Sequence, residues 1–254
     1  MALRRIGRTL AALGLVAVML GVSPGRAAFS VLQMNLCNSG WAGCYTGRSV
    51  AEAAAVIRAW RPDVVTLNEI CREDADALGR SLRAAVSFQP AIDRRVGRPI
   101  QCRDGSPYGI GLLVRRPVDR VGRGDTYPIQ DPGGPEGRAW LCAPAARGFV
   151  ACTTHLVSTN PLIALAQCWY FFTTVVAAFP GPVVVGGDFN LANLSTCRPP
   201  GETADSDGGL QHVAVFGAGG PHRTRVIDMA GTTDHPALLV ALRSTSVANP
   251  STSR

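Results

Sequence analysis

The stretch Val183-Val184-Val185-Gly186-Gly187-Asp188-Phe189-Asn190 joins a β-branched apolar run to two polar side chains that follow it directly. Three consecutive valines between a proline and two glycines are typical of a short, fully buried strand. The glycines lead into an acid and not into a phosphate-gripping lysine, which excludes the P-loop motif. The stretch therefore predicts a buried strand whose carboxyl end carries Asp188 and Asn190.

Polar side chains also stand at the ends of four other predicted strands. They are Asn35, Glu69, His155 and the pair Asp234-His235. Taken singly, each is the kind of residue that ends a strand or starts a turn. Taken together, five such groups favour one crevice, because loops at the strand ends of open sheets converge there.

The remaining pattern alternates helices with strands in the first half and is richer in strands in the second. Apolar residues at helical spacing predict helices over residues 50–60, 74–85 and 162–178. Strands are predicted over residues 29–36, 63–67, 109–115, 138–142, 149–154, 183–185, 211–216 and 237–242. This order favours two packed sheets covered by helices on the outside.

The side chains at the strand ends suit one chemistry. The three carboxylates are hard oxygen ligands for Mg²⁺ or Ca²⁺, and the two asparagines are neutral partners. His155 and His235 can transfer protons or stabilise charge near neutral pH. Metal-assisted phosphoester hydrolysis needs these parts, whereas the Gly-x-Ser-x-Gly nucleophile elbow and the His-Glu-x-x-His zinc helix are absent from the sequence.

In order and spacing these residues resemble the endonuclease/exonuclease/phosphatase superfamily, which includes DNase I-like nucleases, bacterial sphingomyelinases and inositol-phosphate phosphatases. The most specific elements are Val-Gly-Gly-Asp188-Phe-Asn190 and Thr-Asp234-His235-Pro236, and Met-Asn35, Asn-Glu69 and Thr-His155-Leu complete the set. The resemblance runs from about residue 29 to residue 242. It implies an α/β fold, a four-layer α/β/β/α sandwich of two packed mixed sheets with outer helices.

The resemblance also implies a role for each residue. The metal ligands would be Glu69, Asn35 and Asp234, and the ion would be Mg²⁺, or alternatively Mn²⁺ or Ca²⁺. The catalytic residues would be His155, Asp188, Asn190 and His235. Asn190 and His155 would also bind the substrate phosphate, and Arg223, which we place in a Gly-Pro loop, is a further candidate for that contact.

One position departs from the family pattern. Relatives usually carry an aspartate on the penultimate strand that orients the acid/base histidine, and the matching residue here is Gln211. A glutamine carbonyl can fix the tautomer of His235 but does not stabilise an imidazolium as a carboxylate does. Either activity is reduced, or another acid such as Asp205, Asp207 or Asp228 replaces it. In the first case, Gln211→Asp would raise activity.

The N-terminal segment predicts that the protein is exported. Residues 1–28 combine basic residues, an apolar run and small residues, which is the layout of a signal peptide for either the Sec or the twin-arginine route. Residues 29–243 are then one catalytic domain, and residues 244–254 a flexible tail. All 25 basic residues are arginine, and loss of the leader leaves 21 against 18 acids, so the mature charge is only +3. That is a mild bias toward anionic partners.

All eight cysteines lie in the predicted mature part, and an even number in an exported chain favours disulfides over a zinc site. Proximity along the chain favours Cys37–Cys44 and Cys142–Cys152. Cys71–Cys102 and Cys168–Cys197 would then remain.

Three functions compete for this secreted protein, which we expect to be a monomer without a protein partner. A nuclease acting on DNA or RNA is favoured by the arginines and the resemblance. A sphingomyelinase-like or inositol-phosphate phosphatase activity is the alternative, with the aromatic run at residues 169–172 as a membrane-facing patch; packing of that run into the core is the more common case. A catalytically weakened binding module is supported by Gln211 alone.

Overall fold

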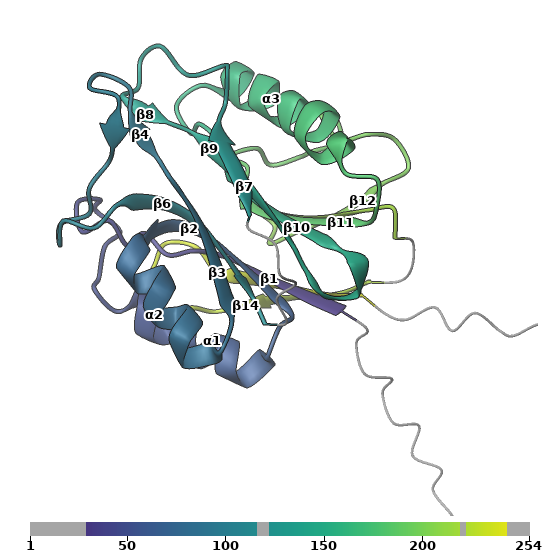
Figure 1. The fold of residues 1–254 in the computed structure, drawn as a ribbon, viewed down its shortest axis with the longest axis horizontal. Coiled ribbons are helices and arrows are strands. Elements are labelled where there is room, and N and C mark those ends of the chain that lie inside the picture. Colours follow the sequence, from purple (N-terminus) through teal and green to yellow (C-terminus); the bar gives the residue numbers. More distant parts are fainter. Residues whose placement is uncertain (1–28, 116–121, 219–221, 243–254) are drawn as a thin grey trace, which may run out of the picture.

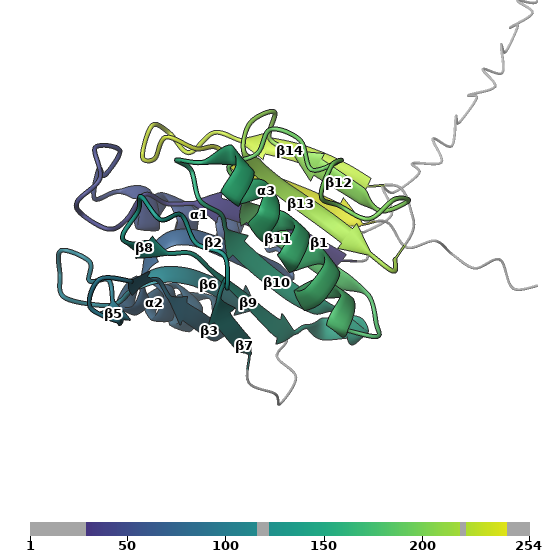
Figure 2. The same cartoon turned by 90° about the horizontal axis from the view of Figure 1, so that it is seen from above.

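The computed structural model describes residues 29–115, 122–218 and 222–242, so the predicted leader and the predicted tail lie outside it. Two six-stranded sheets face each other in the middle of the molecule, and helices lie on both outer faces (Figures 1 and 2). This is the four-layer α/β/β/α arrangement, so the predicted fold class is confirmed.

The first sheet has the strand order β14-β15-β1-β2-β6-β3. The strands span His222–Ile227, Ala237–Leu242, Phe29–Asn35, Val64–Cys71, Tyr108–Val114 and Ala85–Pro90. Helices α1 (Ser49–Trp60) and α2 (Arg72–Leu82) cover its outer face (Figure 1). Both helices begin within one residue or two of the predicted starts, but α2 ends three residues early, where Arg83 adopts a left-handed conformation.

The second sheet has the strand order β12-β13-β11-β10-β9-β7. The strands span Thr203–Ser206, Gln211–Phe216, Val183–Asp188, Val150–His155, Ala139–Pro144 and Arg123–Thr126. Helix α3 (Pro161–Tyr170) covers the outer face and continues through the short turns η2 (Phe171–Val175) and η3 (Val176–Ala178). A small third sheet contains β5 (Arg98–Pro99), β4 (Ile92–Asp93) and β8 (Glu136–Gly137).

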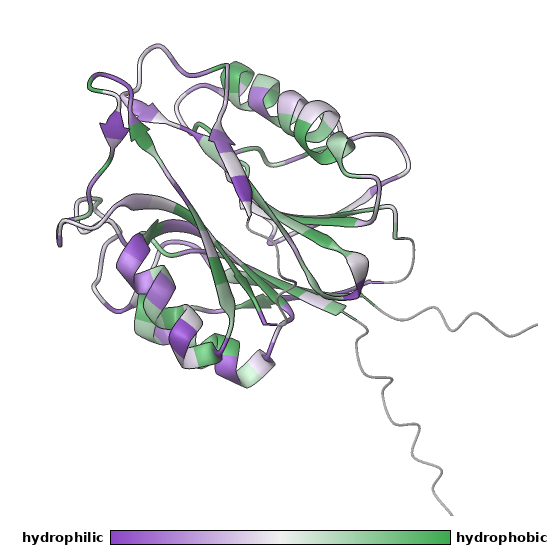
Figure 3. Cartoon of the chain, in the orientation of Figure 1, coloured by the Kyte–Doolittle hydropathy of each residue, from purple (hydrophilic) through white to green (hydrophobic). Residues whose placement is uncertain are grey.

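Three apolar clusters hold the four layers together. One lies between the sheets, one between the first sheet and helices α1 and α2, and one between the second sheet and α3. Figure 3 shows the apolar strands inside and the polar faces of α1 and α2 outside. A strand buried on both faces needs a continuous apolar run, and the three valines of β11, all at most 1% exposed, supply one.

The two glycines of β11 are required by close packing. A Cβ atom on Gly186 would lie 2.2 Å from Oγ1 of Thr66 in the facing sheet, and one on Gly187 would lie 2.5 Å from the carbonyl oxygen of Thr154. The glycines thus let the strand end of β11 approach its neighbours closely, just before Asp188.

Strand direction brings the predicted residues to one end of the molecule. Strand β1 is parallel to β2, and β10 is parallel to β11, with His155 directly opposite Asp188. Strands β13 and β15 are antiparallel to these and begin where they end, at Gln211 and Ala237. The carboxyl ends of four strands and the amino ends of two therefore share one crevice.

All four predicted disulfides are present: Cys37–Cys44, Cys71–Cys102, Cys142–Cys152 and Cys168–Cys197. Within the aromatic run at residues 169–172, Phe171 and Phe172 are packed inward and at most 1% exposed, whereas Trp169 is 46% exposed. The segment Pro161–Ala178 is long and apolar enough to cross a membrane, and its buried side chains pack against the second sheet. Phe171 and Phe172 therefore belong to the core, as the packing interpretation expects.

Candidate active site

Glu69 is turned into the crevice by an irregularity in β2. The register between β2 and β6 shifts between Leu67 and Ile70, and Glu69 lies in the left-handed region with φ 53°. Cys37 and Asn190, also at the crevice, have φ values of 44° and 50°. Non-glycine residues in this region are strained, and such strain concentrates where side chains must be aimed precisely.

Asn35 bridges two of the acids. Its Nδ2 donates to Oε1 of Glu69 and to Oδ2 of Asp188, both at 2.9 Å. Its Oδ1 accepts from the backbone N–H of Cys37 at 3.1 Å. The amide oxygen expected to bind a metal ion is thus directed at Cys37, while the amide nitrogen fixes the positions of Glu69 and Asp188.

Asp188 lies at the centre of the group. Its Oδ2 is 3.6 Å from Nε2 of His235 and 3.9 Å from Nε2 of His155, and its Oδ1 accepts from the N–H of Asn190 at 3.0 Å. The side chain of Asn190 donates to the carbonyl of Leu156 at 2.8 Å, which ties it to the end of β10. The Asp188 carboxylate is therefore the point at which the predicted residues His155, Asn190 and His235 come together.

Buried polar side chains next to the site, Asn68 and Gln33 among them, hold its strands in place. Asn68 Oδ1 accepts from the backbone N–H of Asp188 at 2.7 Å and from Nε2 of Gln33 at 2.7 Å. Nδ2 of Asn68 donates to the carbonyl of Thr154 at 3.0 Å, which links the two sheets. Buried polar groups that are all paired in this way specify one arrangement, so these side chains hold β1, β2, β10 and β11 in register at the crevice.

His155 has a partner that the sequence analysis missed. Nη1 of Arg138 lies 2.7 Å from Nδ1 of His155, and the same Nη1 lies 3.1 Å from Oε1 of Glu136. A guanidinium can only donate, so Nδ1 accepts and the ring proton sits on Nε2, toward Glu69 and Asp188. Burial lowers the pKa of His155 well below its usual value, and the charge of Arg138 lowers it further. The sequence pattern did not identify Arg138, which lies at the start of a predicted strand, as a partner of His155.

His235 lies beside Asp188 and not beside Gln211. Within the described part of the chain, Gln211 Oε1 accepts from Gln33 at 3.2 Å, while its Nε2 donates to Asp207 and to the carbonyl of Pro236. Asp205 binds His222 and Thr224 instead. The carboxylate nearest to His235 in the described residues is that of Asp188, 3.6 Å from Nε2, and neither Asp205 nor Asp207 contacts the ring.

Asp234 and His235 lie on a turn, which differs from the extended segment assumed in the prediction. Oδ1 of Asp234 is 3.9 Å from Nε2 of His235, although neighbours on an extended chain would point apart. Thr233 stabilises the turn by donating to the carbonyl of Asn35 at 3.0 Å. The turn keeps both side chains near the crevice.

Arg223 does not lie near this group. It is part of strand β14 and pairs with Ala241, about 13 Å along β15 from Ala237 at the catalytic end. Its predicted place in a loop was wrong, because the β-branched character of the following residues continues the strand. Nε2 of His212 donates to the carbonyl of Leu191 at 2.7 Å, so this ring is tied to the backbone.

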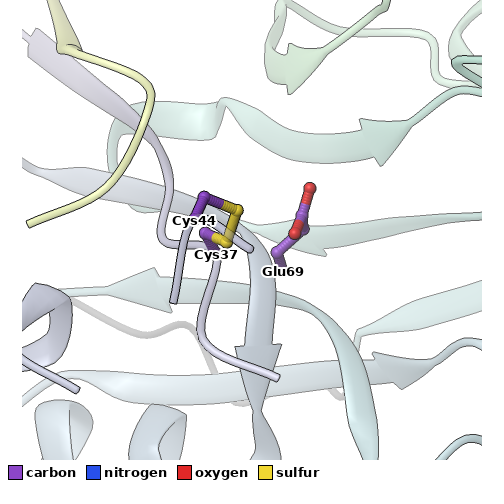
Figure 4. A group of neighbouring side chains, drawn as sticks. All are labelled: Cys37, Cys44 and Glu69. Carbon is purple, nitrogen blue, oxygen red and sulfur yellow. A yellow bond between two sulfur atoms is a disulfide. The ribbon is translucent and has the colours of Figure 1, made fainter. Parts of the chain in front are cut away.

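The donor set beside Glu69 fits a hard divalent cation. The Glu69 side chain is only 20% exposed, and burial is the main cause that raises its pKa, so a positive charge beside it would relieve the cost of ionisation. Asn35 links the Glu69 and Asp188 carboxylates, and the carboxylates of Asp188 and Asp234 lie 3.6 Å and 3.9 Å from Nε2 of His235. The sulfurs of Cys37 and Cys44 lie within 4.8 Å of the Glu69 carboxylate (Figure 4), but a disulfide offers no thiolate to a metal.

Comparisons with known proteins agree with this geometry. The Endonuclease/Exonuclease/phosphatase family model matches residues 34–235. Among curated protein sequences, none is significantly similar.

Solved structures share the fold at low identity. An endonuclease/exonuclease/phosphatase from Beutenbergia cavernae is 19% identical, with a TM-score of 0.63 over 88% of this chain and 74% of that one. TDP2 of D. rerio complexed with single strand DNA product is 15% identical, with a TM-score of 0.64 over 85% and 99%. The human Nocturnin catalytic domain with bound sulfate is 15% identical, with a TM-score of 0.62 over 86% and 94%. With a family match over most of its length, this chain belongs to the endonuclease/exonuclease/phosphatase family.

Proposed function

We propose that this protein is a secreted, Mg²⁺-dependent phosphodiesterase of nuclease type. The observation that carries the proposal is the convergence on Asp188 Oδ2, which lies within 3.9 Å of Nε2 of both His155 and His235 and accepts from Asn35. A carboxylate between two imidazoles suits a reaction in which a water is activated and a leaving oxygen is protonated.

Glu69 and Asp234 would hold the ion, with Asn35 orienting Glu69 and Asp188. A bound divalent cation would supply charge neutralisation on the phosphoryl oxygens. Asp188 and Asn190 orient the attacking water, and Asp188 accepts its proton. His155, with its proton on Nε2, donates a hydrogen bond to a phosphate oxygen, and His235 serves the leaving oxygen as acid.

Nucleic acid is the favoured substrate. The family contains nucleases, and the arginine-rich chain keeps a net positive charge after loss of the leader. The fold is also that of TDP2, which has been solved with a single strand DNA product. Two of the four aromatic residues that would have supported membrane docking, Phe171 and Phe172, are buried against the second sheet, which leaves less apolar surface for the lipid alternative.

Export is part of the proposal. Four disulfides are characteristic of proteins that fold in an oxidising compartment. With a leader at residues 1–28, a catalytic domain at 29–243 and a tail at 244–254, the mature enzyme would act outside the cytoplasm.

The test is hydrolysis by the mature, oxidised protein of plasmid DNA, RNA and sphingomyelin vesicles, each from low to high salt. We expect cleavage of nucleic acid that weakens as salt rises, because the entropy gained by releasing counterions from the phosphates falls as the bulk salt concentration increases. EDTA should abolish cleavage, and Mg²⁺ or Mn²⁺ should restore it. Full activity in EDTA would overturn the metal assignment, and salt-resistant hydrolysis of vesicles with nucleic acid untouched would overturn the substrate.

A further inference from the structure

A loop of residues 37–48, the rim loop, borders the crevice on two sides. At one end the Cys37–Cys44 disulfide lies against the Glu69 carboxylate, with its sulfurs within 4.8 Å (Figure 4). At the other end Oγ1 of Thr46 donates to the carbonyl of Thr232 at 2.6 Å, two residues before Asp234. The rim loop therefore contacts both the Glu69 side and the Asp234 side of the site.

The rim loop presents two aromatic side chains to solvent. Trp41 is 69% exposed, the most exposed of the tryptophans in the described residues, and Tyr45 is 39% exposed. The loop thus carries two exposed rings four residues apart, and Trp41 lies three residues from the cysteine whose sulfur neighbours Glu69, where a flat ligand at the site can cover it.

Trp41 is also held in place. Its Nε1 donates to the carbonyl of Gln101 at 3.1 Å, and its backbone N–H donates to Oγ of Ser39 at 3.2 Å. The N–H of Arg103 donates to the carbonyl of Ser39 at 2.8 Å, and the Cys71–Cys102 disulfide anchors that neighbouring segment to β2. The ring is thus fixed by its polar edge while its faces stay open.

We propose that Trp41 is a stacking platform for an unpaired nucleobase of the substrate. A flat π-surface stacks on any base, and the exposed Arg103 beside it provides a cation for the adjoining phosphate. A base inside a duplex is already covered on both faces, so the platform selects single-stranded or frayed nucleic acid. This inference rests on the proposed function and names the substrate class of the same site.

The composition of the rim loop argues for stacking and against insertion into lipid. Between Asn38 and Gly47 the aliphatic side chains are limited to Ala42, and the rest are polar, glycine, cysteine or aromatic. Membrane insertion depends on a continuous apolar surface, which this loop does not offer. A single ring fixed by an indole hydrogen bond suits one flat partner.

The test compares the binding of a twelve-nucleotide oligothymidylate with that of an abasic strand of the same length. Binding to the mature, oxidised protein is measured by fluorescence anisotropy in EDTA, where no cleavage is expected. The wild type should bind the base-bearing strand roughly tenfold more tightly than the abasic strand. Trp41→Ala should remove this preference, and Trp41→Phe should retain most of it.

Trp60→Ala is the matched control, since Trp60 is 40% exposed at the far end of α1, about 16 Å from Ser49, the first residue after the rim loop. It should leave both affinities unchanged. Equal affinities of wild type and Trp41→Ala for the base-bearing strand, or equal losses on both strands, would overturn the platform. Hydrolysis of DNA by the wild type in Mg²⁺ is measured in parallel and tests the proposed function separately, because its outcome does not depend on whether Trp41 stacks on a base.

Discussion

Nη1 of Arg138 lies 2.7 Å from Nδ1 of His155, and this contact determines what His155 can do. Because the guanidinium can only donate, the imidazole keeps its proton on Nε2, the nitrogen that faces Glu69 and Asp188 at 3.9 Å. Glu136, 3.1 Å from Arg138, holds the guanidinium in turn. His155 is therefore set up as a neutral hydrogen-bond donor and not as a general base.

Arg138→Met should lower kcat by roughly 10²-fold, the scale of one lost charge-stabilising donor. The reason is that His155 becomes free to place its proton on Nδ1, which turns a lone pair toward the substrate. The ¹⁵N chemical shifts of the ring should show the change of tautomer, and Arg138→Lys should restore part of the rate. An unchanged His155 spectrum together with reduced activity would show that Arg138 acts in another way.

Substitutions of His155, His235 and His212 should differ in whether they reduce turnover or stability. His155→Ala and His235→Ala should each reduce turnover by roughly 10²-fold or more with the fold intact. His212→Ala removes the contact with the Leu191 carbonyl, so it should cost about 1–3 kcal/mol of unfolding free energy and leave kcat near the wild type. Rates and denaturant melts on the same preparations measure both; a turnover defect in His212→Ala equal to that of His235→Ala would contradict the assignment.

The structure reverses the expected effect of Gln211→Asp. Nε2 of Gln211 donates to the carbonyl of Pro236, and an aspartate cannot make that bond. We now expect a loss of about 1–3 kcal/mol in unfolding free energy and no gain in turnover, because Asp188 already lies next to His235. Thermal melts and steady-state rates test this. A faster variant of unchanged stability would mean that a second carboxylate does help His235.

Removing the Cys37–Cys44 disulfide should affect both stability and activity. By loop-closure entropy, the double variant Cys37→Ser with Cys44→Ser should lose roughly 2–3 kcal/mol of unfolding free energy. Because the disulfide packs against Glu69, activity at limiting Mg²⁺ should fall more than activity at saturating Mg²⁺. The control is Cys142→Ala with Cys152→Ala, a bridge within the second sheet, which should lower stability without changing the Mg²⁺ dependence. Equal Mg²⁺ dependence in both variants would exclude a role for the rim loop in metal binding.

Glu69→Gln should stabilise the protein in EDTA at neutral pH. Burial raises the folded-state pKa of Glu69, so ionisation at neutral pH disfavours the folded state relative to the unfolded one. The neutral amide removes that cost, and Tm should rise. The difference should shrink as pH falls below the usual glutamate pKa, where Glu69 is protonated in both states. A Tm difference that stays constant with pH would point to packing and not to charge.

Much of the fold could be predicted from local patterns. The valine run with its glycines identified β11, the helical spacing identified α1, α2 and α3, and chain proximity led to the correct disulfides. Strands β3, β7, β12 and β14 were missed because they lie at sheet edges, where half-exposed polar residues such as those of Thr203–Ser206 carry little apolar signal.

By itself, the sequence determined which residues end the buried strands, since apolar periodicity along one element reports burial and termination directly. Only the tertiary structure decided which of those side chains meet. The pairing of Arg138 with His155, the contact of Asp188 with His235 and the distance of Arg223 from the crevice all follow from how strands of two sheets are registered and packed. Register between strands is set by the packed core as a whole, and a shift by one residue turns every side chain to the opposite face, so no local pattern contains it.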